Sequence, residues 1–236
     1  MMRKKKSITN AYFLVPLCFV LLQYALFYFC AKFLCMPYGP FNLETLFDTK
    51  VPFLPGFIYI YVGSYLFWLI SFIYIALKDK ESFYGLAACI TVTFFVSFLI
   101  FVFMPTTIVR PAAVGCGFTQ SLVEFIYNAD SPPLNLFPSM HCLASWLCYI
   151  YMRRIKTVPK PIKLICMIFA IAVFASTQFV KQHYIADVFG GVILAEAGAI
   201  FVRKAGIGQI TDRCFTNLNK KIFGIHIKHG EKIQKS

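Results

Sequence analysis

Long apolar segments are the feature of this sequence that most constrains its fold. They cover residues 11–31, 56–77, 84–104, 139–152, 164–180 and 184–202, and the first three contain no charged residue. A transmembrane helix needs about 20 mostly apolar residues, because each adds about 1.5 Å against a hydrocarbon core of roughly 30 Å. The sequence therefore predicts an all-α polytopic membrane protein, a bundle of six transmembrane helices whose fourth helix is the shortest.

Composition and charge agree with this prediction. Hydrophobic residues make up 59% of the chain and charged residues 14%, whereas soluble domains have roughly 45–50% and about 25%. A soluble enzyme and a disordered chain are therefore excluded. The net charge of +13 alone could suggest nucleic acid as a partner, but the Lys and Arg residues lie between the apolar segments. That placement suits an anionic lipid surface, so membrane lipids are the expected partners and nucleic acid is not.

The positive charges are distributed unevenly between the two sides of such a bundle. Six spans place both termini on one side, and 19 of the 23 Lys and Arg residues fall on that side. Because cytoplasmic loops carry the excess of Lys and Arg, we expect a multi-pass protein of the cell membrane with cytoplasmic termini. Its expected parts are a basic N-terminus (1–10), a six-span domain (11–204) and a basic cytoplasmic tail (205–236).

The outward side of this topology contains the residues that could carry chemistry. They lie in three segments, 105–111, 137–141 and 176–187, each at the outward end of a predicted span. Cys35 and Cys116 also lie in outward loops, where they could form one disulfide. The sequence does not indicate an oligomeric state.

Two of these segments have the chemistry of a phosphate site. Pro138-Ser139 is a favourable helix start, in which Ser139 caps the helix and the backbone N–H of Met140 points outward. Such a helix N-terminus binds phosphate through its N–H groups and the helix dipole. Arg110 adds a permanently charged group that can contact two phosphate oxygens at once.

The histidines provide the chemistry of phosphoryl transfer. His183 and Asp187 are four residues apart, hence on one helix face, so the carboxylate can hold the imidazole in one tautomer. The other ring nitrogen of His183 is then available to attack phosphorus. His141, one turn into the facing helix, is the expected proton donor to the leaving oxygen.

At these residues the sequence resembles the type 2 phosphatidic acid phosphatase superfamily, a membrane-embedded group with a six-helix core. That family reads Lys-x6-Arg-Pro, then Pro-Ser-Gly-His, then Ser-Arg-x5-His-x3-Asp. The matching residues here are Arg110-Pro111, Pro138-Ser139 with His141, and Ser176 with His183 and Asp187. The resemblance implies a phosphohistidine on His183, proton transfer by His141, orientation by Asp187, and neither a metal nor a cofactor.

The sequence departs from the family pattern at three positions. Phe103 and Thr177 stand where the family has its first-motif Lys and third-motif Arg, and Met140 replaces the Gly of the second motif. Two cationic phosphate ligands are thus absent, and Lys181 is the nearby replacement that we expect to bind phosphate. The Ser-Thr start of the third motif is closer to the inositolphosphorylceramide-synthase-like branch, which transfers a phospho-headgroup between lipids.

The resemblance implies a lipid phosphate phosphatase that acts at the extracytoplasmic face of the membrane. Two alternatives remain open, a phospho-headgroup transferase of the inositolphosphorylceramide synthase type and a non-catalytic binder or transporter of lipid phosphates. The identity of the lipid is also open.

In the last span, Glu196 is half a turn out of phase with Asp187 and is expected to pair inside the bundle. Gly191, Ala195 and Gly198 form a small-residue stripe that predicts close helix packing.

Overall fold

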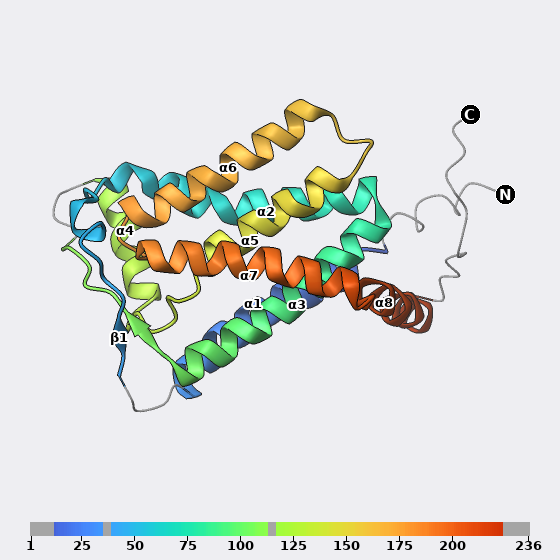
Figure 1. Ribbon diagram of the computed structural model, residues 1–236, viewed down its shortest axis with the longest axis horizontal. Helices are drawn as coiled ribbons and strands as arrows, with labels where there is room; N and C mark the ends of the chain where they lie inside the picture. The colour runs from blue at the N-terminus through green and yellow to red at the C-terminus, as the bar shows by residue number, and fades with distance from the viewer. Residues whose placement is uncertain (1–11, 35–38, 113–116, 224–236) are drawn as a thin grey trace.

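A computed structural model describes residues 12–34, 39–112 and 117–223 of the chain (Figure 1). The basic N-terminus predicted at 1–10 lies outside the described residues, as do Cys35, Cys116 and the segment 224–236. A disulfide between the two cysteines therefore stays a prediction.

Within the described ranges, five helices are long and apolar enough to cross a membrane. They correspond to the first, second, third, fifth and sixth predicted spans, and their properties are compatible with a multi-pass membrane protein. They are α1 (Leu14–Leu34), α2 (Ile58–Lys78), α3 (Lys80–Phe103), α6 (Lys160–Phe179) and α7 (Ile185–Lys204).

The fourth predicted span is a shorter helix, α5 (Met140–Arg154), of 15 residues. At about 1.5 Å per residue it is roughly 22 Å long, which is less than the thickness of the hydrocarbon core. Eleven of its residues are buried, and it packs against α2, α3, α6 and α7. The predicted count of six spans is therefore not confirmed, because α5 is a short central helix among four of the long ones.

Small side chains allow α7 to approach its neighbours closely. A Cβ at Gly191 would lie 2.6 Å from the carbonyl oxygen of Ser139 in the segment before α5, and one at Gly198 would lie 2.4 Å from Cγ2 of Thr93 in α3. Ala195, between them, is fully buried. The predicted stripe of small residues is thus confirmed as a close-packing surface.

Hydrogen bonds of the backbone connect these helices at one end of the bundle. The strand β1 (Phe41–Asn42) follows α1 and pairs in parallel with β2 (Thr106–Thr107), which follows α3. The N–H of Leu54, before α2, donates to the carbonyl of Phe179 at the end of α6 (2.9 Å). The N–H of Phe137, before α5, donates to Oγ1 of Thr106 (2.9 Å). Short 3-10 helices at Asp48–Lys50 and Pro55–Phe57 complete this end of the molecule.

Two further helices occur where the sequence analysis expected a loop and a tail. They are α4 (Phe118–Ala129), in the loop between α3 and α5, and α8 (Ile207–Phe223), in the C-terminal tail. Only Val123 of α4 is buried, whereas α8 packs against α3. Nζ of Lys80 in α3 lies 2.9 Å from Oδ1 of Asp212 in α8. Both helices are amphipathic, so a search for long apolar segments does not find them.

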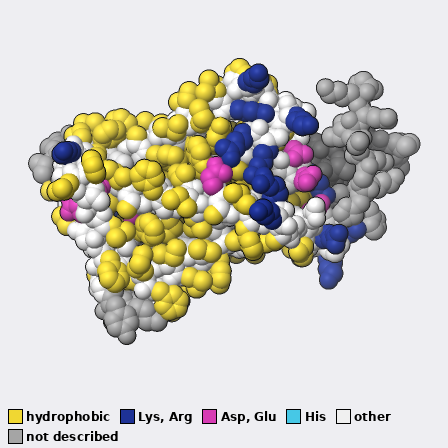
Figure 2. Space-filling model, viewed as in Figure 1, with side chains coloured by type: hydrophobic (Ala, Val, Ile, Leu, Met, Phe, Trp, Pro, Cys, Tyr) yellow, Lys and Arg dark blue, Asp and Glu magenta, His cyan; other side chains and the backbone are white. Residues whose placement is uncertain are grey.

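On the face shown in Figure 2, most of the Lys and Arg side chains lie toward the end of the molecule opposite α4. Figure 2 shows Lys and Arg near α8 and hydrophobic side chains over most of the rest of this face. Glu196 pairs with Arg153 at this end (3.0 and 3.1 Å) and accepts from Nε1 of Trp146 (3.0 Å). The expected pairing of Glu196 exists, but the side chains of Glu196 and Arg153 are 35% and 36% exposed rather than inside the bundle.

Candidate functional site

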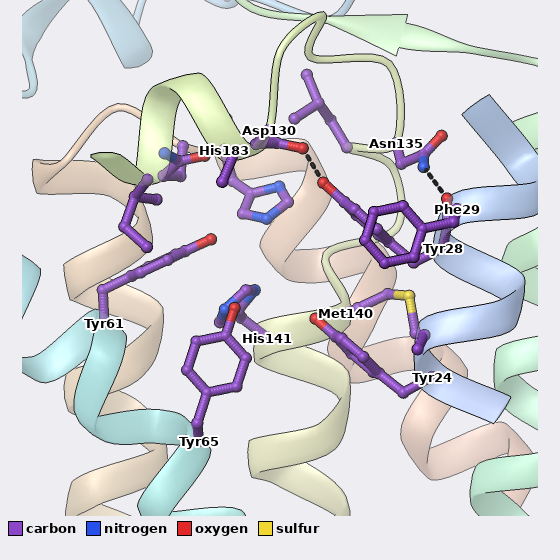
Figure 3. Close-up of a pocket in the computed structure, with 15 residues that line it drawn as sticks. Tyr24, Tyr28, Phe29, Tyr61, Tyr65, Asp130, Asn135, Met140, His141 and His183 are labelled. Atoms are coloured by element: carbon purple, nitrogen blue, oxygen red, sulfur yellow. Dashed lines mark hydrogen bonds between the residues drawn. The ribbon is translucent and has the colours of Figure 1, made fainter. Parts of the chain in front are cut away.

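A cavity of about 280 Å³ lies at the α4 end of the bundle (Figure 3). It combines a mostly aromatic and aliphatic wall with a few polar side chains, which is typical of a small-molecule site. The residues that line it are Tyr24, Ala25, Tyr28, Phe29, Tyr61, Tyr65, Ile126, Ala129, Asp130, Asn135, Leu136, Met140, His141, Gln182 and His183.

His183 and Asp187 form a hydrogen-bonded pair at the start of α7. Oδ2 of Asp187 lies 3.2 Å from Nδ1 of His183 and accepts the backbone N–H of Tyr184 at 2.9 Å. The two side chains are only 6% and 1% exposed. Because the carboxylate engages Nδ1, it fixes the orientation of the imidazole and leaves Nε2 as the ring nitrogen available to a ligand.

The backbone of Asp187 holds α7 against the start of α5. Its carbonyl accepts the N–H of Ser139 at 2.9 Å, and Gly191, one turn later, leaves room for the carbonyl of Ser139. This close approach places His141 beside His183, with 6.3 Å between their ring centroids. One substrate group can therefore contact both rings.

Aromatic side chains of α2 hold His141 in place. Tyr61 stacks on the imidazole with 4.2 Å between centroids, and Tyr65 and Trp68 lie at 5.4 and 5.2 Å. Nε1 of Trp68 donates to Oγ of Ser145, one turn after His141 (2.8 Å). Nε2 of His141 is buried and has no hydrogen-bond partner in the described part of the chain. A buried polar atom of this kind is costly unless a ligand satisfies it.

The start of α5 has the structure that the sequence predicts. Ser139 is the N-cap, and its Oγ accepts the N–H of Cys142 at 3.4 Å. Ser139 itself is fully buried, while Met140 lines the cavity. The first N–H groups of a helix have no partner within the helix, and this end of the helix dipole attracts anions. The N-terminus of α5 therefore favours a negatively charged group in the cavity.

Arg110 contacts two of the residues that line the cavity. Its Nη2 pairs with Oδ2 of Asp130 and donates to Oε1 of Gln182 at 2.7 Å. Its Nη1 donates to the carbonyl of Tyr127 at 3.3 Å, and the guanidinium lies 4.9 Å from the centre of the Tyr127 ring. Burial lowers the pKa of Arg110, but a guanidinium is not deprotonated in proteins and stays charged. Arg110 is thus a fixed cation at the edge of the cavity.

Asp130 is surrounded by three donors from two segments, α1 and the segment after α3. Besides Arg110, the hydroxyl of Tyr28 donates to its Oδ1, and Nζ of Lys32 lies 3.4 Å from the same oxygen. Burial raises the pKa of Asp130 to about 8. The two cations beside the carboxylate, Lys32 and Arg110, act in the opposite direction and favour its ionised form.

Lys181 does not lie in the cavity. Its Nζ donates to the carbonyls of Val51 and Asp48 at 2.6 and 3.1 Å. The backbone of Lys181 has a positive φ of 51°, and its side chain is directed to the 48–51 segment rather than toward His183. The expected phosphate contact of Lys181 is absent from this arrangement, because backbone carbonyls engage its ammonium group.

Two of the three positions that depart from the family motifs, Phe103 and Thr177, have other roles in this fold. Phe103 is 61% exposed at the end of α3. Thr177 is fully buried, and its carbonyl accepts the N–H groups of Gln182 and His183 at 2.9 and 3.2 Å. Thr177 therefore shapes the turn between α6 and α7 that presents His183.

Sequence reasoning missed Gln182 and Asp130. Gln182 is 1% exposed, and its Nε2 has no partner among the described residues, although its Oε1 accepts from Arg110. Its position next to His183 was a usable signal. No sequence signal distinguishes Asp130 from Glu124, an acidic residue of the same segment that is exposed.

Comparison with known proteins gives one match. The family model for the PAP2 superfamily, the type 2 phosphatidic acid phosphatases, matches residues 49–201. This range contains Arg110, both histidines and Asp187, and it begins after α1. No curated protein and no solved structure matches the chain. In the described ranges, no group of three or more His, Cys, Asp or Glu side chains is placed to hold a metal ion.

Proposed function

The chain belongs to the PAP2 superfamily, and from this premise we propose that it is an integral-membrane lipid phosphate phosphatase acting through a phosphohistidine on His183. The family suggests a phosphatase-type activity on lipid phosphates. One observation carries the finer proposal: the imidazole of His183, paired with Asp187, faces that of His141 across a single cavity.

In the first step, Nε2 of His183 attacks phosphorus while the bond between phosphorus and the lipid oxygen breaks. His141 donates a proton to that oxygen, which leaves as the lipid alcohol. Asp187 stabilises the positive charge that develops on His183. Arg110 and the N-terminus of α5 lie at the same cavity and favour the negative charge on the phosphoryl oxygens.

In the second step, a water molecule attacks the phosphohistidine. His141 removes a proton from this water, the bond between phosphorus and Nε2 breaks, and inorganic phosphate leaves. Each histidine then returns to its starting protonation state. A lipid hydroxyl in place of water would give headgroup transfer by the same two residues.

The position of the cavity supports an active site on the extracytoplasmic side of the membrane. The cavity lies at the α4 end, while Lys and Arg gather at the α8 end (Figure 2). Since the basic end of a membrane protein faces the cytoplasm, the α4 end faces outward. The aromatic wall formed by Tyr24, Tyr28, Tyr61 and Tyr65 suits the apolar part of a lipid beside its phosphate.

Rapid quenching of two variants tests this mechanism. With p-nitrophenyl phosphate, His183→Ala should form no phosphoenzyme, because the attacking nitrogen is missing. His141→Ala should still be phosphorylated, because p-nitrophenolate needs little protonation to leave. It should then accumulate acid-labile phosphohistidine, because its second step lacks a base. A lipid phosphate, with its poor leaving group, should barely react with this variant.

Wild-type protein in detergent, assayed with a short-chain lipid phosphate and a chelator, sets the reference for both variants. Thermal unfolding of each variant excludes loss of the fold as the cause. Equal labelling of the two variants, or a label on His141, contradicts the assigned roles. Release of no phosphate and transfer of no headgroup by the wild type would favour a non-catalytic binder.

A further inference from the structure

Three donors from different parts of the fold converge on the carboxylate of Asp130. Lys32 and Tyr28 of α1 contact Oδ1, and Arg110 contacts Oδ2. The side chains of Lys32, Asp130 and Arg110 are 13%, 18% and 9% exposed. Contacts with this little exposure are screened much less than those at a surface.

The carboxylate belongs to the cavity that contains both histidines. Figure 3 shows Asp130 joined to Tyr28 above the rings of His183 and His141, and all four residues line the same cavity. Two oxygens of one anion are held by two cations, as two oxygens of a phosphate group would be. Gln182, which also lines the cavity and accepts from Arg110, keeps a buried Nε2 without a partner in the described ranges.

We propose that Lys32 is the second cationic ligand of the substrate phosphate, beside Arg110, and that Asp130 occupies both cations until the phosphate displaces it. This inference rests on the proposed function and adds a residue outside the family motifs. Lys32 lies in α1, whereas the family match begins at residue 49. In this proposal, Lys32 supplies positive charge that is missing at Phe103 and Thr177, where the family motifs have Lys and Arg.

The place of Asp130 in the fold allows this exchange. Asp130 follows α4, in which only Val123 is buried, so a displaced carboxylate does not disturb the packed core of the bundle. Nζ of Lys32 also lies 5.2 Å from the centre of the ring of Tyr28, a residue that lines the cavity, and this contact holds the ammonium beside Tyr28 when its partner changes.

The charge balance of this group selects a class of substrate. Displacing Asp130 opens its contacts with Arg110 and Lys32 to the incoming group, which then meets two positive charges. A phosphate monoester carries close to two negative charges at neutral pH, because its second pKa is about 6. A phosphodiester carries only one. The site should therefore prefer lipid phosphate monoesters to phosphodiester lipids.

Binding of inorganic phosphate to the purified full chain tests the proposal without turnover. We would measure the dissociation constant by calorimetry in a His183→Ala background, so that no covalent intermediate forms. Lys32→Gln should weaken binding about tenfold or more, the effect of losing one charged hydrogen bond. Asp130→Asn should strengthen binding by about tenfold, because it removes an internal competitor. Lys50→Gln, an exposed cation on the same face, is the matched control and should bind like its parent.

The double variant Lys32→Gln/Asp130→Asn separates a ligand from a partner of Asp130. If Lys32 contacts phosphate, the double variant stays weaker than Asp130→Asn alone. If Lys32 only holds Asp130, the two bind equally, and the proposal is overturned. Unchanged binding in Lys32→Gln, weaker binding in Asp130→Asn, or no binding in any variant overturns it as well. The variants could bind phosphate as predicted while the wild type releases no phosphate from a lipid phosphate. This result would refute the proposed phosphatase activity but support the site with two cations.

Discussion

The close contact between α7 and α5 makes Gly191→Ala the sharpest test of how the fold positions the two histidines. Gly191 lies one turn after Asp187, and its Cα faces the start of α5. A Cβ there would meet the Ser139 carbonyl oxygen at 2.6 Å, the Leu143 nitrogen at 3.2 Å and Cβ of Cys142 at 3.3 Å. Two of these atoms are backbone, so no side-chain rotation relieves the clash.

The distances in the α7–α5 contact give the size of the shift that Gly191→Ala would cause. Ordinary contact begins at 3.4 Å, so the 2.6 Å approach requires a shift of about 0.8 Å between the helices. Overpacking of this kind typically costs about 1–3 kcal/mol of stability. The same shift separates His183 from His141, and a misplacement of about 1 Å can lower a rate about 10²-fold. We therefore expect both a lower unfolding temperature and a turnover reduced by about 10²-fold.

Gly63→Ala is the matched control for this variant. Gly63 lies within α2, and a Cβ there would meet only Cζ of Phe169, at an ordinary 3.8 Å. Alanine is favoured over glycine in a helix interior by about 1 kcal/mol, so this variant should be at least as stable as the wild type. Thermal unfolding in detergent and phosphate release from a lipid phosphate measure both effects. Wild-type stability and turnover in Gly191→Ala would refute the role assigned to this contact.

Two further predictions concern the phosphate contact and the topology. Arg110→Lys should lower turnover on a lipid phosphate by about 10²–10³-fold, because Lys keeps the charge but loses the planar fork; a change within about twofold would make Arg110 a structural anchor. A cysteine at Glu124 in α4 should react with an impermeant thiol reagent on intact cells, and one at Lys156 should not, each compared with the parent protein. The reverse labelling would place the site on the cytoplasmic side.

The parts of the fold that could be predicted from the sequence depend on local patterns. An uninterrupted apolar segment has one stable form in a bilayer, so the five long helices follow from length and composition. The pairing of His183 with Asp187 follows from helical spacing, and the capping of α5 by Ser139 follows from residue type. In each case the interacting groups lie within four residues of one another.

The remaining features depend on contacts between distant segments. Lys181 lies two residues from His183, yet its ammonium group is bound by carbonyls more than a hundred residues earlier in the chain. Its positive φ directs the backbone away from the continuation of α6. Asp130 is polar and lies in a loop, so no local pattern indicates that it is held by cations from α1 and from the segment after α3. The direction of the Lys181 side chain therefore could not be predicted from its distance in sequence to His183.

The absent motif cations and the Asp130 cluster have a common electrostatic explanation. A site for a dianion needs compensating positive charge, but cations at 13% and 9% exposure are costly to keep out of water when no anion lies beside them. Both cations contact the carboxylate of Asp130. In our proposal, this one anion offsets part of their positive charge while no substrate is bound. A cation at Phe103, which is 61% exposed, would need no such partner. If Lys32 of α1 supplies the second positive charge, an acidic residue of the protein is needed beside it. Asp130 is that residue, so the proposal couples substrate entry to the release of Asp130.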